Sequence, residues 1–183
     1  RDLAIITPDG ERTIFVVGAP LHPRRADDLP WDVLAKCDAV YFTGQDPETL
    51  VAAREARVLV VTARRIEALV ASGIRADVVV GSTRDPREAS TLADYAVPPH
   101  ALVMTQGAAG GYVETAAGTT QWLASPAPDP IVGSYGSGDT FAAALTWYLA
   151  DGHDPVEACE RAAKHGAAVL RGVNPLDWQL ELE

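Results

Sequence analysis

Three short, uninterrupted apolar runs rich in β-branched residues stand out along the chain. They cover residues 39–44, 58–62 and 78–80. Continuous runs of this kind are typical of strands that are covered on both faces, as in a parallel sheet. Stretches with helical patterning lie between the runs, so strands and helices alternate. This alternation predicts an α/β fold in which a central, mostly parallel sheet is flanked by helices.

The same dipeptide, Asp-Pro, marks three predicted helix starts, at residues 46–47, 85–86 and 154–155. Each pair offers an N-cap Asp followed by Pro at the first helical position. At the second and third places a Glu stands three residues after the Asp, which is a capping-box arrangement. The third start predicts a last helix from Pro155 to about Arg171, with Glu157–Arg161 and Glu160–Lys164 as i,i+4 ion pairs.

The first residues have the pattern of a β-hairpin. Leu3–Thr7 and Arg12–Val17 flank the segment Pro8-Asp9-Gly10, which places Asp-Gly at the turn. The pattern alone describes an edge hairpin without a role. Internal repeats are absent from the sequence, and the one linker-like stretch, residues 124–130, is interpreted as a loop. We therefore expect a single domain over residues 1–183, with the hairpin in about residues 1–20.

Composition and charge narrow the classes of partner. A chain of 183 residues that is 48% hydrophobic and 22% charged is long enough for one sizeable core. The net charge of −10 argues against nucleic acid or an anionic membrane as the main partner, because both need a basic face. No apolar run has membrane-spanning length and the first residues do not form a signal peptide, so we expect a cytoplasmic protein.

A turn of small residues, Gly136-Ser137-Gly138, leads into Asp139 and then into an apolar run from Phe141 to Leu149, which predicts a buried helix. The first N–H groups of such a helix form an anion site. A carboxylate there repels phosphate, but it fits if it takes a proton from a hydroxyl while the N–H groups hold the transferred phosphoryl group. An ordinary helix start with an acidic residue at the favourable end of the dipole is the alternative.

Two segments together resemble the ribokinase-like (PfkB-type) carbohydrate kinases. The stretch 134–139, Ser-Tyr-Gly-Ser-Gly-Asp, followed by Ala-Ala-Leu at 143–145, resembles the C-terminal signature of that family. The stretch 105–110, Thr-Gln-Gly-Ala-Ala-Gly, resembles the family's T-x-G-x-x-G nucleotide loop and lies upstream at the expected order and distance. As a bare pattern, this second segment is equally a hairpin turn into Tyr112 and Val113.

The resemblance implies a ribokinase-like fold with a small β lid, and ATP with Mg²⁺ as the phosphoryl donor. The implied acceptor is an alcohol group of a sugar or sugar-like molecule. Alternatives are a nucleoside (adenosine-like) kinase of the same family or a non-catalytic nucleotide- or sugar-binding relative. The hairpin is implied to be the lid, which often forms a homodimer contact. The implied roles are Asp139 as catalytic base, Gly136, Ser137 and Gly138 as the anion hole, and Thr105, Gly107 and Gly110 as nucleotide contacts.

The chain departs from the family pattern near the expected metal site. Where relatives commonly have Asn-x-x-Glu to organise the hydrated Mg²⁺, this chain has Ser82 and Asp85. Both offer oxygen atoms to a hard cation, so an indirect metal role is possible, but Asp85 also has its explanation as a helix cap. Gly133 stands where many relatives have an Asp that helps to bind a monovalent cation, which makes activation by potassium doubtful.

The last helix adds two candidate nucleotide contacts. Lys164 occupies a position that is often Asn or His near the adenine, and a surface ion pair with Glu160 is the alternative. The neighbouring His165 has two interpretations, core packing and the nucleotide pocket. Family members are considerably longer, and their N-terminal part, which carries most sugar contacts, has no counterpart here. We therefore expect this chain to be the C-terminal portion of the fold and to need the N-terminal part for stability.

Overall fold

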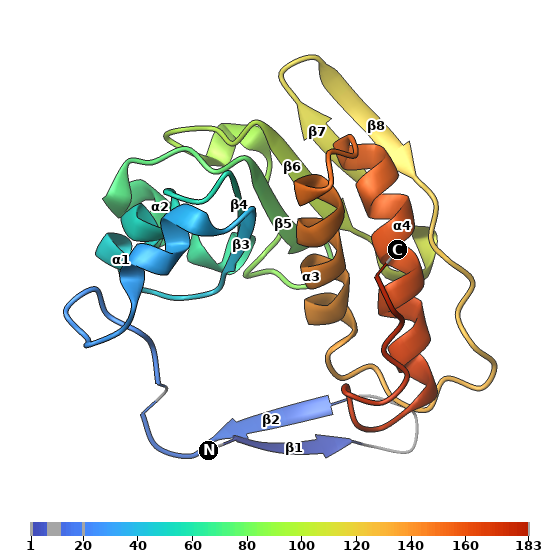
Figure 1. Ribbon diagram of the computed structural model, residues 1–183. Coiled ribbons are helices and arrows are strands. Elements are labelled where there is room, and N and C mark those ends of the chain that lie inside the picture. Colours follow the sequence, from blue (N-terminus) through green and yellow to red (C-terminus); the bar gives the residue numbers. More distant parts are fainter. Residues whose placement is uncertain (1, 7–11, 20, 183) are drawn as a thin grey trace.

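The computed structural model describes residues 2–6, 12–19 and 21–182, and its centre is a six-stranded sheet (Figure 1). The strands lie side by side in chain order: β3 (Ala39–Phe42), β4 (Val58–Thr62), β5 (Val78–Ser82), β6 (Ala101–Thr105), β7 (Gly111–Thr115) and β8 (Gly118–Trp122). Neighbouring strands from β3 to β6 are parallel, whereas β7 and β8 are antiparallel to their neighbours. The predicted mostly parallel sheet is therefore confirmed.

Helices cover both faces of this sheet. One face is covered by α1 (Pro47–Ala53) and α2 (Ile66–Ser72), the other by α3 (Ser137–Ala150) and α4 (Pro155–Ala168), as Figure 1 shows. The last helix continues as a 3₁₀ turn, Val169–Arg171, so the predicted end near Arg171 is correct. Further 3₁₀ turns lie at Trp31–Lys36, Ala63–Arg65, Leu92–Asp94 and Gly107–Ala109.

The β-branched runs are explained by two separate cores. On β4, Leu59 and Val61 pack under α1 and α2, whereas Val60 packs under α3 and α4. Strands β5 and β6 alternate in the same way. Because successive side chains point to opposite faces and both faces are buried, these strands have no polar positions in their middle. On the α3 side, Phe141 stacks on Trp122 with ring centroids 5.3 Å apart.

The N-terminal residues form a small sheet of their own. Strands β1 (Asp2–Ile6) and β2 (Arg12–Val16) pair antiparallel, as predicted, while the Asp-Gly turn lies outside the described residues. Figure 1 places this pair apart from the six-stranded sheet, facing the end of the molecule where α3 begins. Side chains on the pair, among them Leu3, Ile5 and Phe15, are exposed.

Two of the three predicted helix caps are confirmed. The Asp46 carboxylate accepts a hydrogen bond from the Thr49 N–H at 2.9 Å, and Asp154 accepts from the N–H groups of Val156 and Glu157 at 2.9 and 3.1 Å. The prediction for Asp85 is wrong. The chain after it makes a single turn, closed by the Ala89 N–H on the Asp85 carbonyl at 2.9 Å, and no helix follows.

The ion pairs of α4 agree with the sequence only in part. Glu157 and Arg161 pair at 2.8 Å as predicted. The Glu157 carboxylate also contacts His153 at 3.1 Å. It therefore binds side chains rather than the N-cap backbone, and the predicted capping box is not completed. In the described part of the chain, Glu160 and Lys164 make no ion pair with each other.

Helix α3 is buried on one side only, although its sequence predicts burial all round. Leu145 is fully buried, but Trp147 is 50% exposed and Ala143 is exposed. The reason is the position of α3 over β3 and β4, at the edge of the sheet. Within the described ranges, β3 has no neighbouring strand on its outer side.

The stability of the α3 face can be tested at Leu145. Leu145→Ala should lower the free energy of unfolding by about 2–5 kcal/mol, because it leaves a cavity in a fully buried site. Urea unfolding followed by circular dichroism measures this. The control Val70→Ala removes a side chain that is 55% exposed on α2 and should change stability by less than about 0.5 kcal/mol. Equal effects of the two variants would mean that α3 does not anchor the fold.

Candidate active site

The candidate active site lies at the carboxyl ends of the parallel strands. Thr62, Ser82 and Thr105 are the last residues of β4, β5 and β6, and Ser82 is paired directly opposite Thr105. Carboxyl ends of parallel strands share one edge of a sheet, which is where open α/β sheets bind their ligands. Helix α3 begins at the same end of the molecule (Figure 1). The fold therefore brings the two family-like motifs to one edge.

The turn before α3 requires glycine at its central position. Gly136 is the N-cap of the helix and has a left-handed backbone with φ of 80°. A Cβ atom built on it would lie 2.4 Å from the Cβ of Pro175, far inside contact distance. Both the backbone angle and the close approach of the C-terminal segment therefore exclude a side chain here.

The first turn of α3 offers N–H groups to a ligand. The Thr140 N–H bonds to the Gly136 carbonyl at 2.8 Å, and the Ser137 N–H makes a long bond of 3.4 Å to Ser134. Among the described residues, the N–H groups of Gly138 and Asp139 have no such acceptor. The start of a 14-residue helix with open N–H groups has the geometry of an anion site. Asp139, in the same turn, is exposed.

A tyrosine that the motifs do not include lies close to Asp139. Tyr41, on β3, points to the α3 side of the sheet and is partly buried. Burial raises the pKa of Tyr41 above its usual value, and the nearby charge of Asp139 raises it further. The phenol therefore stays protonated and can act as a hydrogen-bond donor. Side chains alternate between the two faces of a strand, so within the run 39–44 Tyr41 is the aromatic residue on the same face as Val60. This alternation is the feature of the sequence that could have indicated Tyr41.

The predicted nucleotide loop is the connection between β6 and β7. The Gln106 backbone N–H donates to the Gly110 carbonyl at 2.7 Å, and the Gly110 N–H donates to the Gly107 carbonyl at 3.0 Å. The hydroxyl of Thr105 donates to the Gly81 carbonyl at 3.2 Å and so ties the loop to β5. The segment is thus a tight turn between antiparallel strands, as the bare pattern allowed. Its contact with a nucleotide stays a prediction.

The structure separates the two candidates on α4. His165 is buried, and its Nε2 lies 3.0 Å from the Tyr148 hydroxyl. Burial, followed by the charge of Lys164, lowers the pKa of His165, so the ring is neutral at pH 7. This contact corresponds to the packing alternative for His165. Lys164 is exposed. Gly166, two residues further, approaches the first turn of α3: a Cβ there would lie 3.2 Å from the Ser137 carbonyl oxygen.

The carboxylate proposed near the metal is already occupied by arginines. Asp85 pairs with Arg64 at 2.5 Å and with Arg87 at 3.1 Å, and it accepts from the Arg87 N–H at 2.9 Å. Arg64 also binds Glu88. Hydrogen bonds from Arg87, together with the charges of both arginines, lower the pKa of Asp85. These contacts explain why no helix starts at Asp85, because the turn is held against the residues that follow β4.

Ser82 and Asp85 therefore do not fit a direct metal site in this conformation. Ser82 Oγ accepts the Arg84 N–H at 3.2 Å, and both Asp85 oxygens have arginine partners. In the part of the chain that the structure describes, no three His, Cys, Asp or Glu side chains converge to hold an ion. We derive no catalytic step through a metal held by these residues.

A long groove connects Asp139 to the open edge of the sheet. Its volume is about 1080 Å³. It runs from Tyr135 and Asp139 along the exposed flank of α3, past Trp147, to residues 36–39 at the start of β3, and the C-terminal segment 175–182 lines its other side. Most of this groove therefore lies between the outer flank of α3 and the C-terminal segment, and only the end at Asp139 adjoins the candidate site.

Comparison with known protein families identifies the family to which this chain belongs. Residues 52–177, more than half of the chain, match the model of the pfkB family carbohydrate kinases. The chain belongs to this family. The match includes both motifs at the sheet edge. No curated protein matches the sequence.

Solved structures agree on the fold. Ribokinase from Thermotoga maritima superposes with a TM-score of 0.77 at 13% identity, over 98% of this chain and 66% of its own. Adenosine kinase from Sinorhizobium meliloti gives 0.73 at 22% identity, over 96% and 62%. Arabidopsis thaliana ribokinase, solved with ribose and ATP, gives 0.73 at 16% identity, over 97% and 65%. The chain thus has a ribokinase-like fold and spans less than two thirds of the length of these relatives. Within the described residues, no helix has the length and apolar character needed to cross a membrane.

The constraint on Gly136 can be measured against a second left-handed glycine. Gly152 has φ of 98° and open space around it, so Gly152→Ala should lower the free energy of unfolding by only about 1–2 kcal/mol, the cost of the backbone conformation. Gly136→Ala adds the collision with Pro175 and should cost about 1–3 kcal/mol more. Urea unfolding of both variants tests this. Equal losses would show that Pro175 does not hold the turn.

The arginine contacts of Asp85 predict a pH dependence. The pKa of Asp85 is lowered on folding, so its contribution to stability is present above the pKa of the unfolded chain, about 3.9, and is lost as the pH falls through the folded value. Asp85→Asn should lower the free energy of unfolding by up to about 1 kcal/mol at pH 7, and the difference should be smaller at about pH 3, below the pKa of the unfolded chain. Urea unfolding at both pH values measures it.

The control is Asp32→Asn, whose exposed ion pair with Lys36 is 3.9 Å long. It should leave stability unchanged at both pH values, because the pair is screened by solvent. A loss for Asp85→Asn that does not change with pH would contradict the assignment to the ionised carboxylate.

Proposed function

We propose that the protein is the C-terminal portion of an ATP-dependent phosphotransferase that phosphorylates an alcohol group of a sugar or sugar-like small molecule. The observation that carries the proposal is the first turn of α3. There an obligatory glycine, open N–H groups and the Asp139 carboxylate lie together at the end of the sheet where open α/β sheets commonly bind ligands. Membership of the pfkB family supports the same reaction.

In the proposed reaction the acceptor hydroxyl attacks the γ-phosphorus of ATP. Asp139 takes the hydroxyl proton, the new O–P bond forms, and the bond to the β-phosphate oxygen breaks with release of ADP. The N–H groups of Gly136, Ser137 and Gly138 are the proposed anion hole for the transferred group, with those of Ser137 and Gly138 at the helix N-terminus. This division of work explains why a carboxylate stands beside an anion site.

ATP as donor is supported by the Arabidopsis ribokinase, whose structure contains ribose and ATP. We propose that Thr105, Gly107 and Gly110 line the nucleotide site, with Lys164 at its side; the buried contact of His165 with Tyr148 favours a packing role for that residue. Mg²⁺ would accompany the phosphates of ATP. A role for Ser82 and Asp85 in organising that ion would require Asp85 to exchange its arginine partners.

The acceptor has two candidate classes. Relatives with the same fold include ribokinases and an adenosine kinase, so a nucleoside is the alternative to a sugar. We propose the β1–β2 pair as a lid over the acceptor, because it lies at the end of the molecule where α3 begins (Figure 1). Its exposed apolar side chains suit a homodimer contact. A non-catalytic binding protein is the third possibility.

The role of Asp139 is tested with Asp139→Asn in the complete protein. The variant should lower kcat by about 10²–10⁴-fold, because the hydroxyl proton loses its acceptor, while ATP affinity is retained. Coupled ADP release is measured with Mg·ATP against a panel of sugars, sugar acids and nucleosides. Asp151→Asn, at the opposite end of α3, is the matched control and should keep wild-type kcat.

Near-normal kcat in Asp139→Asn would remove Asp139 from the role of base. Tight ATP binding by the wild-type protein without product from any acceptor would favour the non-catalytic alternative.

A further inference from the structure

Arg84, at the sheet edge, has no ion pair with an acidic residue among those that the structure describes. The side chain of Arg84, just beyond β5, lies directly against the backbone of Gly107 in the predicted nucleotide loop. A Cβ atom on Gly107 would be 2.6 Å from the guanidinium carbon of Arg84. Gly107 also has a left-handed backbone with φ of 65°. The guanidinium thus occupies the space in which any other residue at 107 would carry its side chain.

Backbone contacts fix the two loops to one another. The Thr83 N–H donates to the Thr105 carbonyl at 3.0 Å, and the Thr83 hydroxyl donates to the same oxygen at 3.3 Å. The Arg84 N–H donates to Ser82 Oγ at 3.2 Å. Since Ser82 and Thr105 are paired in the sheet, Arg84 starts from a rigid position at the rim of the loop.

Arg84 remains available to bind a ligand, because the acidic side chains near it are bound to other arginines. Its neighbours Arg64 and Arg87 are bound to Asp85, and Arg64 also to Glu88. In the described residues, the exposed guanidinium of Arg84 has neither an ion pair nor a side-chain hydrogen bond. Of the arginines 64, 84 and 87, Arg84 is thus the one without a carboxylate partner, although the chain as a whole carries −10.

The loop itself carries no positive charge. Residues 105–111 contain neither lysine nor arginine, and the whole chain has only two lysines, Lys36 and Lys164. A cationic side chain for a polyphosphate on this loop would therefore come from another segment. A guanidinium presents its donors in a planar fork that matches two phosphate oxygens, and that of Arg84 lies against Gly107 of this loop.

We propose that Arg84 is a phosphate-binding residue of the nucleotide site, which holds the polyphosphate of ATP over the turn at Gly107. The inference rests on the proposed function, because it assumes that the loop binds ATP. It also gives Gly107 a second purpose, since only glycine leaves room for the guanidinium on the loop. Arg84 thereby selects for the phosphates rather than for the adenosine part.

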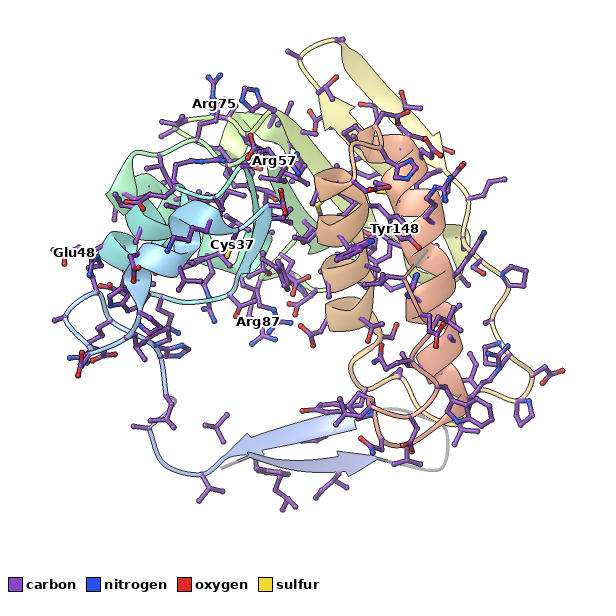
Figure 2. All side chains as sticks on the ribbon, viewed as in Figure 1. Cys37, Glu48, Arg57, Arg75, Arg87 and Tyr148 are labelled. Carbon is purple, nitrogen blue, oxygen red and sulfur yellow. The ribbon has the colours of Figure 1, made fainter. Side chains whose placement is uncertain are left out.

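The test compares Arg84→Gln with Arg75→Gln in the complete protein. Arg75 is an exposed arginine that precedes β5, at the opposite end of the sheet; Figure 2 shows it far from Arg87, which follows Arg84 closely in the chain. Calorimetric titration measures the affinities for Mg·ATP, ADP and adenosine. Arg84→Gln should weaken ATP and ADP binding by about tenfold to a hundredfold and leave adenosine binding unchanged. Arg75→Gln should match the wild type, and Arg84→Lys should fall between the two, since it keeps the charge without the fork.

The possible results distinguish a failure of the inference about Arg84 from a failure of the proposed function. If the wild type binds ATP and turns over but Arg84→Gln equals Arg75→Gln, the inference about Arg84 is wrong and the proposed function stands. If adenosine binding falls as much as ATP binding, Arg84 supports the loop rather than the phosphates, and the inference is again wrong. A wild-type protein that neither binds ATP nor forms product overturns both.

Discussion

The candidate site depends on how closely backbone segments approach the first turn of α3. Three glycines make these approaches possible. Gly136 lies against Pro175, Gly166 on α4 against the Ser137 carbonyl, and Gly133 against the Gly172 carbonyl, which a Cβ would meet at 2.8 Å. Together they hold the turn from two sides. Since the turn sets where the N–H groups and Asp139 point, the geometry of the site is a consequence of main-chain packing more than of side-chain contacts.

The sequence predicts the sheet well because its strands are buried on both faces. A strand such as β4, covered by helices on both sides, has no reason to place a polar residue in its middle, and the resulting β-branched run is visible without a structure. The two glycine-rich motifs could also be found, since tight backbone geometry leaves a residue-type signal. The same reasoning predicts too much burial for α3, because composition does not reveal that β3 is an edge strand.

What the sequence does not reveal comes from contacts between distant segments. The Asp-Pro pairs at 46–47, 85–86 and 154–155 look alike, yet only the second fails to start a helix. The difference is Arg64, which follows another strand and binds both Asp85 and Glu88. Two further contacts also join distant segments: Tyr41 lies near Asp139, and Arg84 lies against Gly107. Local rules of capping and propensity cannot include a partner that lies twenty or more residues away.

The strands of the six-stranded sheet lie in the same order as in the chain, and this has a consequence for how the site forms. Each strand from β4 to β8 pairs with the one made just before it, so the sheet can assemble in steps that close only short lengths of chain. During synthesis the sheet can therefore be largely paired before α3 has been translated. The turn at Gly136 is different, because its contacts with Gly166 of α4 and with Pro175 come from later residues. The contacts that shape the turn carrying Asp139 can therefore form only after α4 and Pro175 have been made, whereas the sheet edge needs neither.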